Sequence, residues 1–128
     1  MNPQSIKTDK APAPIGPYNQ AVKAGNMVFV SGQIAINPEN GELETGDIET
    51  ETNRVMQNLG AVLEAGGSSF NRVVKTTIFL SDMALFGTVN EIYGKYFGEH
   101  FPARETVAVK TLPKNVNVEI SAIAAVSA

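Results

Sequence analysis

Glu119 is the residue of this 128-residue chain that most clearly calls for a chemical explanation. It stands in "VNVEISAIAAV", residues 116–126, whose other positions all suit the inside of a strand. A carboxylate in apolar surroundings loses its hydration and must recover it from partners or take up a proton. Glu119 therefore either belongs to a site, together with a residue such as Arg104 in "FPARETVAVK", or faces solvent.

Residue types that are scarce or missing exclude several other kinds of chemistry. The chain has no cysteine, and its one histidine, His100 in "YFGEHFP", is interpreted as a cap at a helix end. A thiol nucleophile, a zinc site and a Ser-His-Asp triad are therefore not expected. Neither GxGxxG nor GxxxxGK[ST] occurs. We expect any catalysis to use carboxylates, Arg, Lys, Tyr, hydroxyl groups and backbone amides.

Composition indicates one folded domain over residues 1–128. Hydrophobic residues make up 43% and charged residues 18%, which favours a packed core over disorder. The net charge of −3 gives no reason to expect nucleic acid or an anionic membrane as partner. The segment "MNPQSIKTDKAPAP" lacks the apolar run of a signal peptide, and no later segment has the length to span a bilayer. A cytoplasmic location is expected.

Hydrophobic periodicity predicts the elements that position these residues. The predicted elements are a hairpin over residues 20–32, a turn in "INPENGEL", a helix over 47–65 ended by Gly66-Gly67, a strand over 72–82, a second helix capped by Asp82, and two strands over 101–110 and 116–126. The order ββαβαββ predicts an α+β fold, a mixed sheet with two helices on one face.

Alternation along the last two strands gives each an apolar face and a mixed face. Residues 116, 118, 120, 122, 124 and 126 form the apolar face that should meet the helices, and Glu119 lies opposite. Arg104 shares the mixed face of its own strand with Thr106 and Ala108. Two helices cover one side of a sheet, so this mixed side is expected to form a subunit interface. The residues alone also allow Glu119 and Arg104 to be ordinary surface residues.

Motifs along the chain resemble a known family. "APIGPYNQAV", "VFVSGQIAINPENGEL", "NLGAVLEAGGSSFNRVVKTTIFLSDM", "VNEIYGKYFGEHFPAR" and "VEISAIA" are similar, in this order, to RidA, the reactive intermediate deaminase branch of the YjgF family. The resemblance covers about residues 8 to 126. It implies a homotrimer of chorismate-mutase-like subunits, with the sheets forming a central barrel and three ligand clefts between neighbours.

The same resemblance implies hydrolysis of 2-iminobutanoate and 2-iminopropanoate to 2-oxo acids and ammonia, without a cofactor or metal. Removal of these reactive imines and enamines would protect pyridoxal-phosphate enzymes from 2-aminoacrylate. Two alternatives stay open. One is a non-catalytic protein that binds a small carboxylate. The other, less favoured for an acidic chain, is a ribonuclease or translation inhibitor.

Site residues follow from the resemblance, which implies Glu119, Arg104 and Tyr18 as catalytic residues and Arg104, Ser31, Gly32, Thr106 and Asn90 as substrate-binding residues. The Arg104 guanidinium would bind the substrate carboxylate with two hydrogen bonds. Glu119 would hold a water as general base. The hydroxyls of Tyr18 and Ser31 would orient ligand or water, Gly32 would permit close approach, the Thr106 amide would hold ligand, and Asn90 would have a supporting role.

The chain departs from the family pattern at two positions. Relatives commonly read "RSTVEV" or "RSCVEV", whereas this chain reads "RETVAV", with Glu105 and Ala108. Glu105 should point away from Arg104 and leave its guanidinium free. Ala108 removes a carboxylate, so the interface is expected to differ more than the catalysis.

Overall fold

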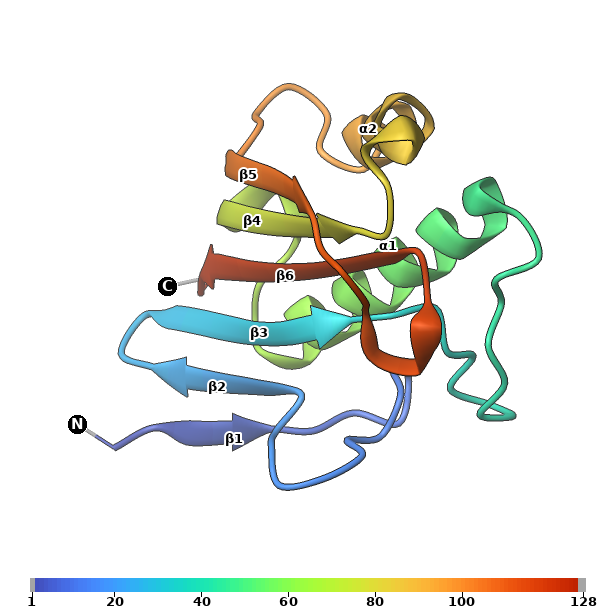
Figure 1. The fold of residues 1–128 in the computed structure, drawn as a ribbon. Coiled ribbons are helices and arrows are strands. Elements are labelled where there is room, and N and C mark those ends of the chain that lie inside the picture. The colour runs from blue at the N-terminus through green and yellow to red at the C-terminus, as the bar shows by residue number, and fades with distance from the viewer. Residues whose placement is uncertain (1, 127–128) are drawn as a thin grey trace.

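A computed structural model describes residues 2–126 as a six-stranded sheet with two helices against one face (Figure 1). The strands are β1 Gln4–Ile6, β2 Ala21–Ala24, β3 Met27–Gln33, β4 Val73–Leu80, β5 Ala103–Ala108 and β6 Val118–Ala125; the helices are α1 Ile48–Ala65 and α2 Phe86–Gly94, with short 3₁₀ turns η1 Phe70–Arg72, η2 Met83–Leu85 and η3 Pro113–Asn115. The sheet order is β1-β2-β3-β6-β4-β5. Only the β4–β5 pair is parallel among these strands, so the prediction of a mixed α+β sheet is confirmed.

β1 is the strand that the sequence pattern did not predict. It has three residues and pairs with β2 at the edge of the sheet. A segment this short carries too few positions for alternation to be visible, and its backbone pairing depends on a hairpin elsewhere in the chain. The predicted hairpin itself is confirmed, since β2 and β3 turn at Gly25, whose φ is +62°.

α1 begins and ends as its sequence predicts. The side chain of Asp47 accepts a hydrogen bond from the Thr50 amide at 2.8 Å, which caps the first turn. The apolar stripe is fully buried and consists of Val55, Met56, Leu59, Val62 and Leu63. Gly66 caps the end, and Gly67 takes the left-handed conformation with φ +82°.

α2 is entered through a turn that the sequence pattern merged with the helix. Asp82 accepts from the Ala84 amide at 2.8 Å and so caps η2, which then continues into α2. The predicted stripe still packs inward, because Val89, Ile92 and Tyr93 are buried. Among residues 2–126, no helix is long and apolar enough to cross a membrane.

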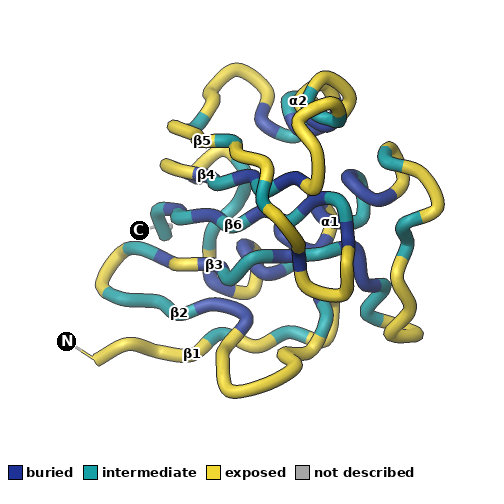
Figure 2. Tube along the Cα trace, in the orientation of Figure 1, coloured by how far each residue is buried: buried dark blue, intermediate teal, exposed yellow. Residues whose placement is uncertain are grey.

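β6 runs through the middle of the sheet with two different faces. Val118, Ile120, Ala122 and Ala124 are buried beneath the helices, as predicted, while Glu119 on the opposite face is half-buried (Figure 2). That opposite face, here called the open face, has no helix over it in the described chain. It exposes apolar side chains, including Phe29 at 45% and Val107 at 44%.

The register of β5 and β6 with β4 corrects the expectation that Arg104 and Glu119 share one face of the sheet. Arg104 pairs with Thr76, which pairs with Ala122 on the helix face. Glu119 pairs with Phe79 on the open face. Paired residues share a face, so Arg104 and Glu119 lie on opposite faces, and the expectation of one common mixed surface was wrong. Alternation within a strand does not say which of its faces aligns with which face of a neighbour; that depends on register.

Candidate active site

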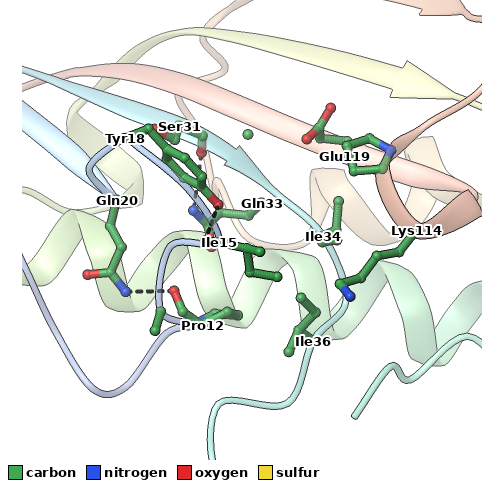
Figure 3. Close-up of a pocket in the computed structure, with 13 residues that line it drawn as sticks. Pro12, Ile15, Tyr18, Gln20, Ser31, Gln33, Ile34, Ile36, Lys114 and Glu119 are labelled. Carbon is green, nitrogen blue, oxygen red and sulfur yellow. Dashed lines mark hydrogen bonds between the residues drawn. The ribbon is translucent and has the colours of Figure 1, made fainter. Parts of the chain in front are cut away.

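The open-face side of β3 and β6 borders a cavity of about 540 Å³ (Figure 3). This volume is within the usual range for small-molecule sites. The lining residues come from the loop before β2, the end of β3 and its continuation, η3, and β6: Pro12, Ala13, Ile15, Tyr18, Gln20, Ser31, Gly32, Gln33, Ile34, Ile36, Pro113, Lys114 and Glu119. Tyr18, Ser31, Gly32 and Glu119 are thus brought together as the sequence suggested.

Glu119 presents a carboxylate that has neither a hydrogen-bond donor nor a salt-bridge partner within residues 2–126. Burial therefore acts unopposed and raises the pKa of the Glu119 carboxyl above its ordinary value. A carboxylate that is hard to keep ionised binds a proton more strongly, which is the property a general base needs.

Ser31 and Gly32 lie at an irregularity in β3. Between the pairs Val30–Ala122 and Gln33–Ile120, β3 advances by three residues and β6 by two, so β3 carries one extra residue there. A Cβ on Gly32 would lie 2.7 Å from Oε2 of Glu119, which is too close. We expected glycine to admit a ligand; in the structure it makes room for the Glu119 side chain.

The hydroxyls of Ser31 and Tyr18 contact the backbone of the loop that forms the outer wall. Ser31 donates its Oγ hydrogen to the carbonyl of Asn19 at 2.6 Å. Tyr18 packs its ring over the cavity, and its hydroxyl accepts a long contact of 3.4 Å from the Ile15 amide. The Tyr18 hydroxyl keeps its hydrogen for a ligand, whereas Ser31 has given its hydrogen to Asn19 and can offer a ligand only its oxygen as acceptor.

Gln20 and Lys114 are pocket residues that the sequence reasoning missed. Gln20 is buried and bonds the loop backbone, accepting from the Thr8 amide at 2.7 Å and donating to the Pro12 carbonyl at 2.9 Å. Lys114 has a left-handed φ of 54°, and its side chain passes Ile34 along the cavity (Figure 3). Gln20 stands in the quoted "APIGPYNQAV" segment, whereas nothing in "TLPKN" signals a left-handed lysine.

Arg104 lies on the other face of the sheet, in a cradle formed by α2. Its Nη1 donates to Oδ1 of Asn90 at 2.6 Å. The guanidinium carbon is 5.3 Å from the Phe86 ring centroid and 5.2 Å from that of Tyr93, both suited to cation–π contact. Tyr93 is held in turn by a 2.6 Å hydrogen bond with Thr76. The asparagine leaves the other guanidinium N–H groups free for a carboxylate.

Thr106 is on the helix face with Arg104, two residues along β5. Its hydroxyl oxygen is buried and has no hydrogen-bond partner within residues 2–126. The residues suggested by the sequence therefore fall into two groups: Tyr18, Ser31, Gly32 and Glu119 line the cavity, while Arg104, Asn90 and Thr106 lie beyond it.

Comparison with known protein families shows which family the chain belongs to. Residues 8–126 match the family described as Endoribonuclease L-PSP. The chain belongs to this family. The match covers the same span as the motifs that resemble RidA and YjgF, and L-PSP relatives carry deaminase names, so that resemblance is confirmed.

Three L-PSP relatives illustrate the similarity. A 2-iminobutanoate/2-iminopropanoate deaminase of Mus musculus is 50% identical over 119 residues, which are 93% of this chain and 88% of the mouse protein. A crystal structure from Thermotoga maritima is 58% identical with a TM-score of 0.94, covering 98% of each chain. The crystal structure of E. coli TdcF with bound serine is 42% identical with a TM-score of 0.92, covering 97% of this chain and 99% of that one. These neighbours confirm the L-PSP fold.

The described part of this L-PSP chain holds no group of three or more His, Cys, Asp or Glu side chains that could bind a metal ion. The polar groups at the cavity include a carboxylate, two hydroxyls, a lysine and the side-chain amides of two glutamines. Such a set can move a proton and orient water beside an electrophilic carbon.

Proposed function

We propose that this protein hydrolyses 2-iminobutanoate and 2-iminopropanoate to the corresponding 2-oxo acids and ammonia. Such activity would keep 2-aminoacrylate from damaging pyridoxal-phosphate enzymes. The observation that carries the proposal is the half-buried Glu119 carboxylate, without a donor and with a raised pKa, at a cavity that also presents the hydroxyls of Tyr18 and Ser31. Relatives of the L-PSP family that are about half identical in sequence carry the name of this deaminase.

Glu119 has the central role in the proposed reaction. It takes a proton from water as the water oxygen bonds to the imine carbon, which gives a carbinolamine. That proton goes to the imine nitrogen, which completes the neutral carbinolamine. Glu119 then takes the hydroxyl proton of the carbinolamine and transfers it to the nitrogen as the C–N bond breaks, so the C=O bond forms and ammonia leaves. One water is consumed and one ammonia released, with no oxidation or reduction. The imine carbon is already electrophilic, so positioning contributes much of the required acceleration.

Arg104 binds the substrate carboxylate in this proposal, with Asn90 fixing the guanidinium and the Thr106 amide assisting. Because Arg104 and Glu119 occupy opposite faces of one sheet, we infer that a cleft combines Glu119 of one copy with Arg104 of a neighbour. A heterologous interface of this kind forms a ring when its rotation closes, and the family resemblance suggests a homotrimer. The exposed apolar residues of the open face, among them Phe29 and Val107, support burial there.

A non-catalytic receptor for small carboxylates is the main alternative. The serine-bound structure of TdcF shows that a relative binds a small amino acid. A receptor would need Arg104 but would gain nothing from a partly desolvated carboxylate opposite it, so Glu119 favours catalysis. RNA cleavage, which the family description names, is disfavoured by the net charge of −3.

A coupled assay tests the proposal. Threonine dehydratase and threonine generate 2-iminobutanoate, and release of 2-oxobutanoate is followed without the protein, with it, and with its Glu119→Gln variant. We expect the wild-type protein alone to accelerate release. Equal rates in all three reactions would refute the deaminase proposal, and tight 2-oxobutanoate binding without acceleration would establish the receptor instead.

A further inference from the structure

Glu51 is a fully buried carboxylate on α1 that the proposed reaction does not use. Its exposed fraction is 0%. Its oxygens accept three hydrogen bonds, from the Asn117 amide at 2.7 Å, from Nδ2 of Asn117 at 2.9 Å and from the Val118 amide at 3.0 Å. A buried carboxylate is costly unless donors satisfy it, and these three donors do so.

The three donors belong to the two residues that directly precede Glu119. Val118 lies beyond the last residue pair between β6 and β3, which joins Ile120 to Gln33. Glu51 therefore provides an acceptor where β3 no longer runs beside β6. Asn117 is also fixed to the end of β4, because Ser81 donates both its amide and its hydroxyl hydrogen to Asn117, each at 2.9 Å.

The position of the Glu119 carboxylate depends on this part of the backbone. No described donor holds its side chain, so the position of its carboxylate follows from where β6 places the Cα atom. That position is demanding, because the side chain lies within the space that a Cβ on Gly32 would occupy. A small shift at the start of β6 would move the carboxylate off Gly32 and out of the cavity.

We propose that Glu51 is a positioning residue for Glu119: by binding Asn117 and Val118 it fixes the start of β6 so that the Glu119 carboxylate stays against Gly32 at the cavity. The same bonds hold residues that follow closely after the η3 turn, whose Lys114 forms another wall of the cavity. The catalytic consequence of this placement rests on the deaminase function proposed above; the placement itself does not.

A carboxylate is required at position 51 because all the groups facing it are donors. The two backbone amides share Oε2 of Glu51 and Nδ2 of Asn117 uses Oε1, so glutamine, with one acceptor oxygen, would turn its NH₂ group toward one of these two sets of donors. At least one buried N–H would then lose its acceptor, and the start of β6 would shift to regain one. Glu51→Gln thus changes the bonding with almost no change in size.

The test compares Glu51→Gln with Val62→Ala, a substitution at another fully buried position of α1 that has no polar contact with β6. Both variants should have a lower unfolding temperature. We expect Glu51→Gln to reduce kcat for imine hydrolysis by about 10- to 100-fold with KM within about threefold of wild type, because misplacement by an ångström costs on that order. Val62→Ala should keep the wild-type kcat. Equal kcat values in Glu51→Gln and wild type would overturn the proposal.

Titration of the Glu119 carboxyl by ¹³C NMR provides a readout that does not need turnover. If Glu51 holds Glu119 in place, Glu51→Gln should lower the pKa of the Glu119 carboxyl toward its ordinary value. An unchanged titration would overturn the placement. A wild-type protein that fails to hydrolyse imines would refute the deaminase function, whereas the titration would still decide the role of Glu51.

Asn117→Ala is the second variant, for use if Glu51→Gln does not fold. It removes one of the three donors and keeps both backbone bonds. We expect a smaller shift of the Glu119 titration in the same direction and a reduction in kcat of a few-fold. A folded Asn117→Ala protein with wild-type titration and wild-type kcat would contradict the proposal.

Discussion

Glu119 on β6 and Arg104 on β5 are positioned by different means. The Glu119 side chain has no hydrogen-bond partner within residues 2–126. Its position depends on its own backbone, on the space left by the missing side chain of Gly32, and on Glu51. Arg104 is exposed at the edge of the sheet and depends on side chains of α2: the amide of Asn90 and the rings of Phe86 and Tyr93. The Glu119 carboxylate is partly desolvated and unpaired, whereas the Arg104 guanidinium is exposed to solvent and held by side chains of α2.

This difference matches the tasks that the two residues have in the proposed reaction. A general base benefits from a raised pKa, and desolvation provides it. A carboxylate-binding arginine keeps its charge in any environment and benefits from a fixed orientation of its planar donors, which the α2 cradle supplies. In the proposed reaction, each copy of the chain would therefore contribute two half-sites, because Arg104 and Glu119 lie on opposite faces of its sheet.

Loss of the base should have the largest effect. Glu119→Gln keeps the size of the side chain but cannot accept the proton from water, so turnover should fall about 100- to 10,000-fold. Binding of 2-oxobutanoate, measured by calorimetry, should be retained. Glu64→Gln, on the exposed side of α1, is the matched control and should behave as wild type. Full turnover in Glu119→Gln would show that this carboxylate is not the base.

Changes at Arg104 should be next in size. Arg104→Lys keeps the charge but loses the bidentate geometry, so kcat/KM should fall roughly 10- to 100-fold, and Arg104→Ala should lose at least as much. Sedimentation should show the same assembly for both variants. Wild-type kcat/KM in Arg104→Lys would mean that the carboxylate is bound elsewhere.

The cradle around Arg104 should contribute less than the arginine itself. Phe86→Leu removes one aromatic face, and we expect KM to rise roughly two- to tenfold with kcat unchanged. Tyr93→Phe keeps its ring and should keep KM, although loss of the Thr76 hydrogen bond should lower the unfolding temperature. A KM effect as large in Tyr93→Phe as in Phe86→Leu would argue against the cation–π contacts.

The pH dependence should show the smallest effect, and it distinguishes the two half-sites. Activity requires ionised Glu119, and burial raises the pKa of this carboxyl, so activity should be lost as pH falls through a value above the ordinary 4.5 of glutamate. In the pH profile of kcat/KM, the acid limb should therefore lie at a higher pH than the limb that a free carboxyl group would give. Arg104→Lys should keep this limb in place, because both side chains are cations throughout this range. A limb at or below the ordinary value would contradict desolvation of Glu119.

The sequence predicted the elements that apolar periodicity defines. The buried stripe of α1, the hairpin at Gly25 and the buried face of β6 follow from spacing within one segment. The face of β5 that carries Arg104 could not be predicted, because it depends on register between strands. Glu51 lies four residues before Val55, on the buried stripe of α1, and that spacing was a signal for a buried carboxylate.

The pocket residues that escaped prediction share a physical reason. Gln20 makes long-range hydrogen bonds through its side chain, and Lys114 reaches the cavity from a left-handed turn; neither feature leaves a period in the sequence. The sequence did suggest glycine at position 32 as a close-approach site, but the group that approaches is Glu119 rather than a ligand. Contacts between segments distant in sequence decide such details.

Subunit complementation tests the central claim that each cleft combines half-sites from two copies. Glu119→Gln and Arg104→Ala proteins, each inactive alone, are unfolded and refolded together in equal amounts, with sedimentation used to verify trimers. Clefts that pair an intact Glu119 with an intact Arg104 form between unlike subunits, and random assembly should restore about one quarter of wild-type activity. If both residues served one site within a single chain, no mixture would regain activity, and that result would contradict the account.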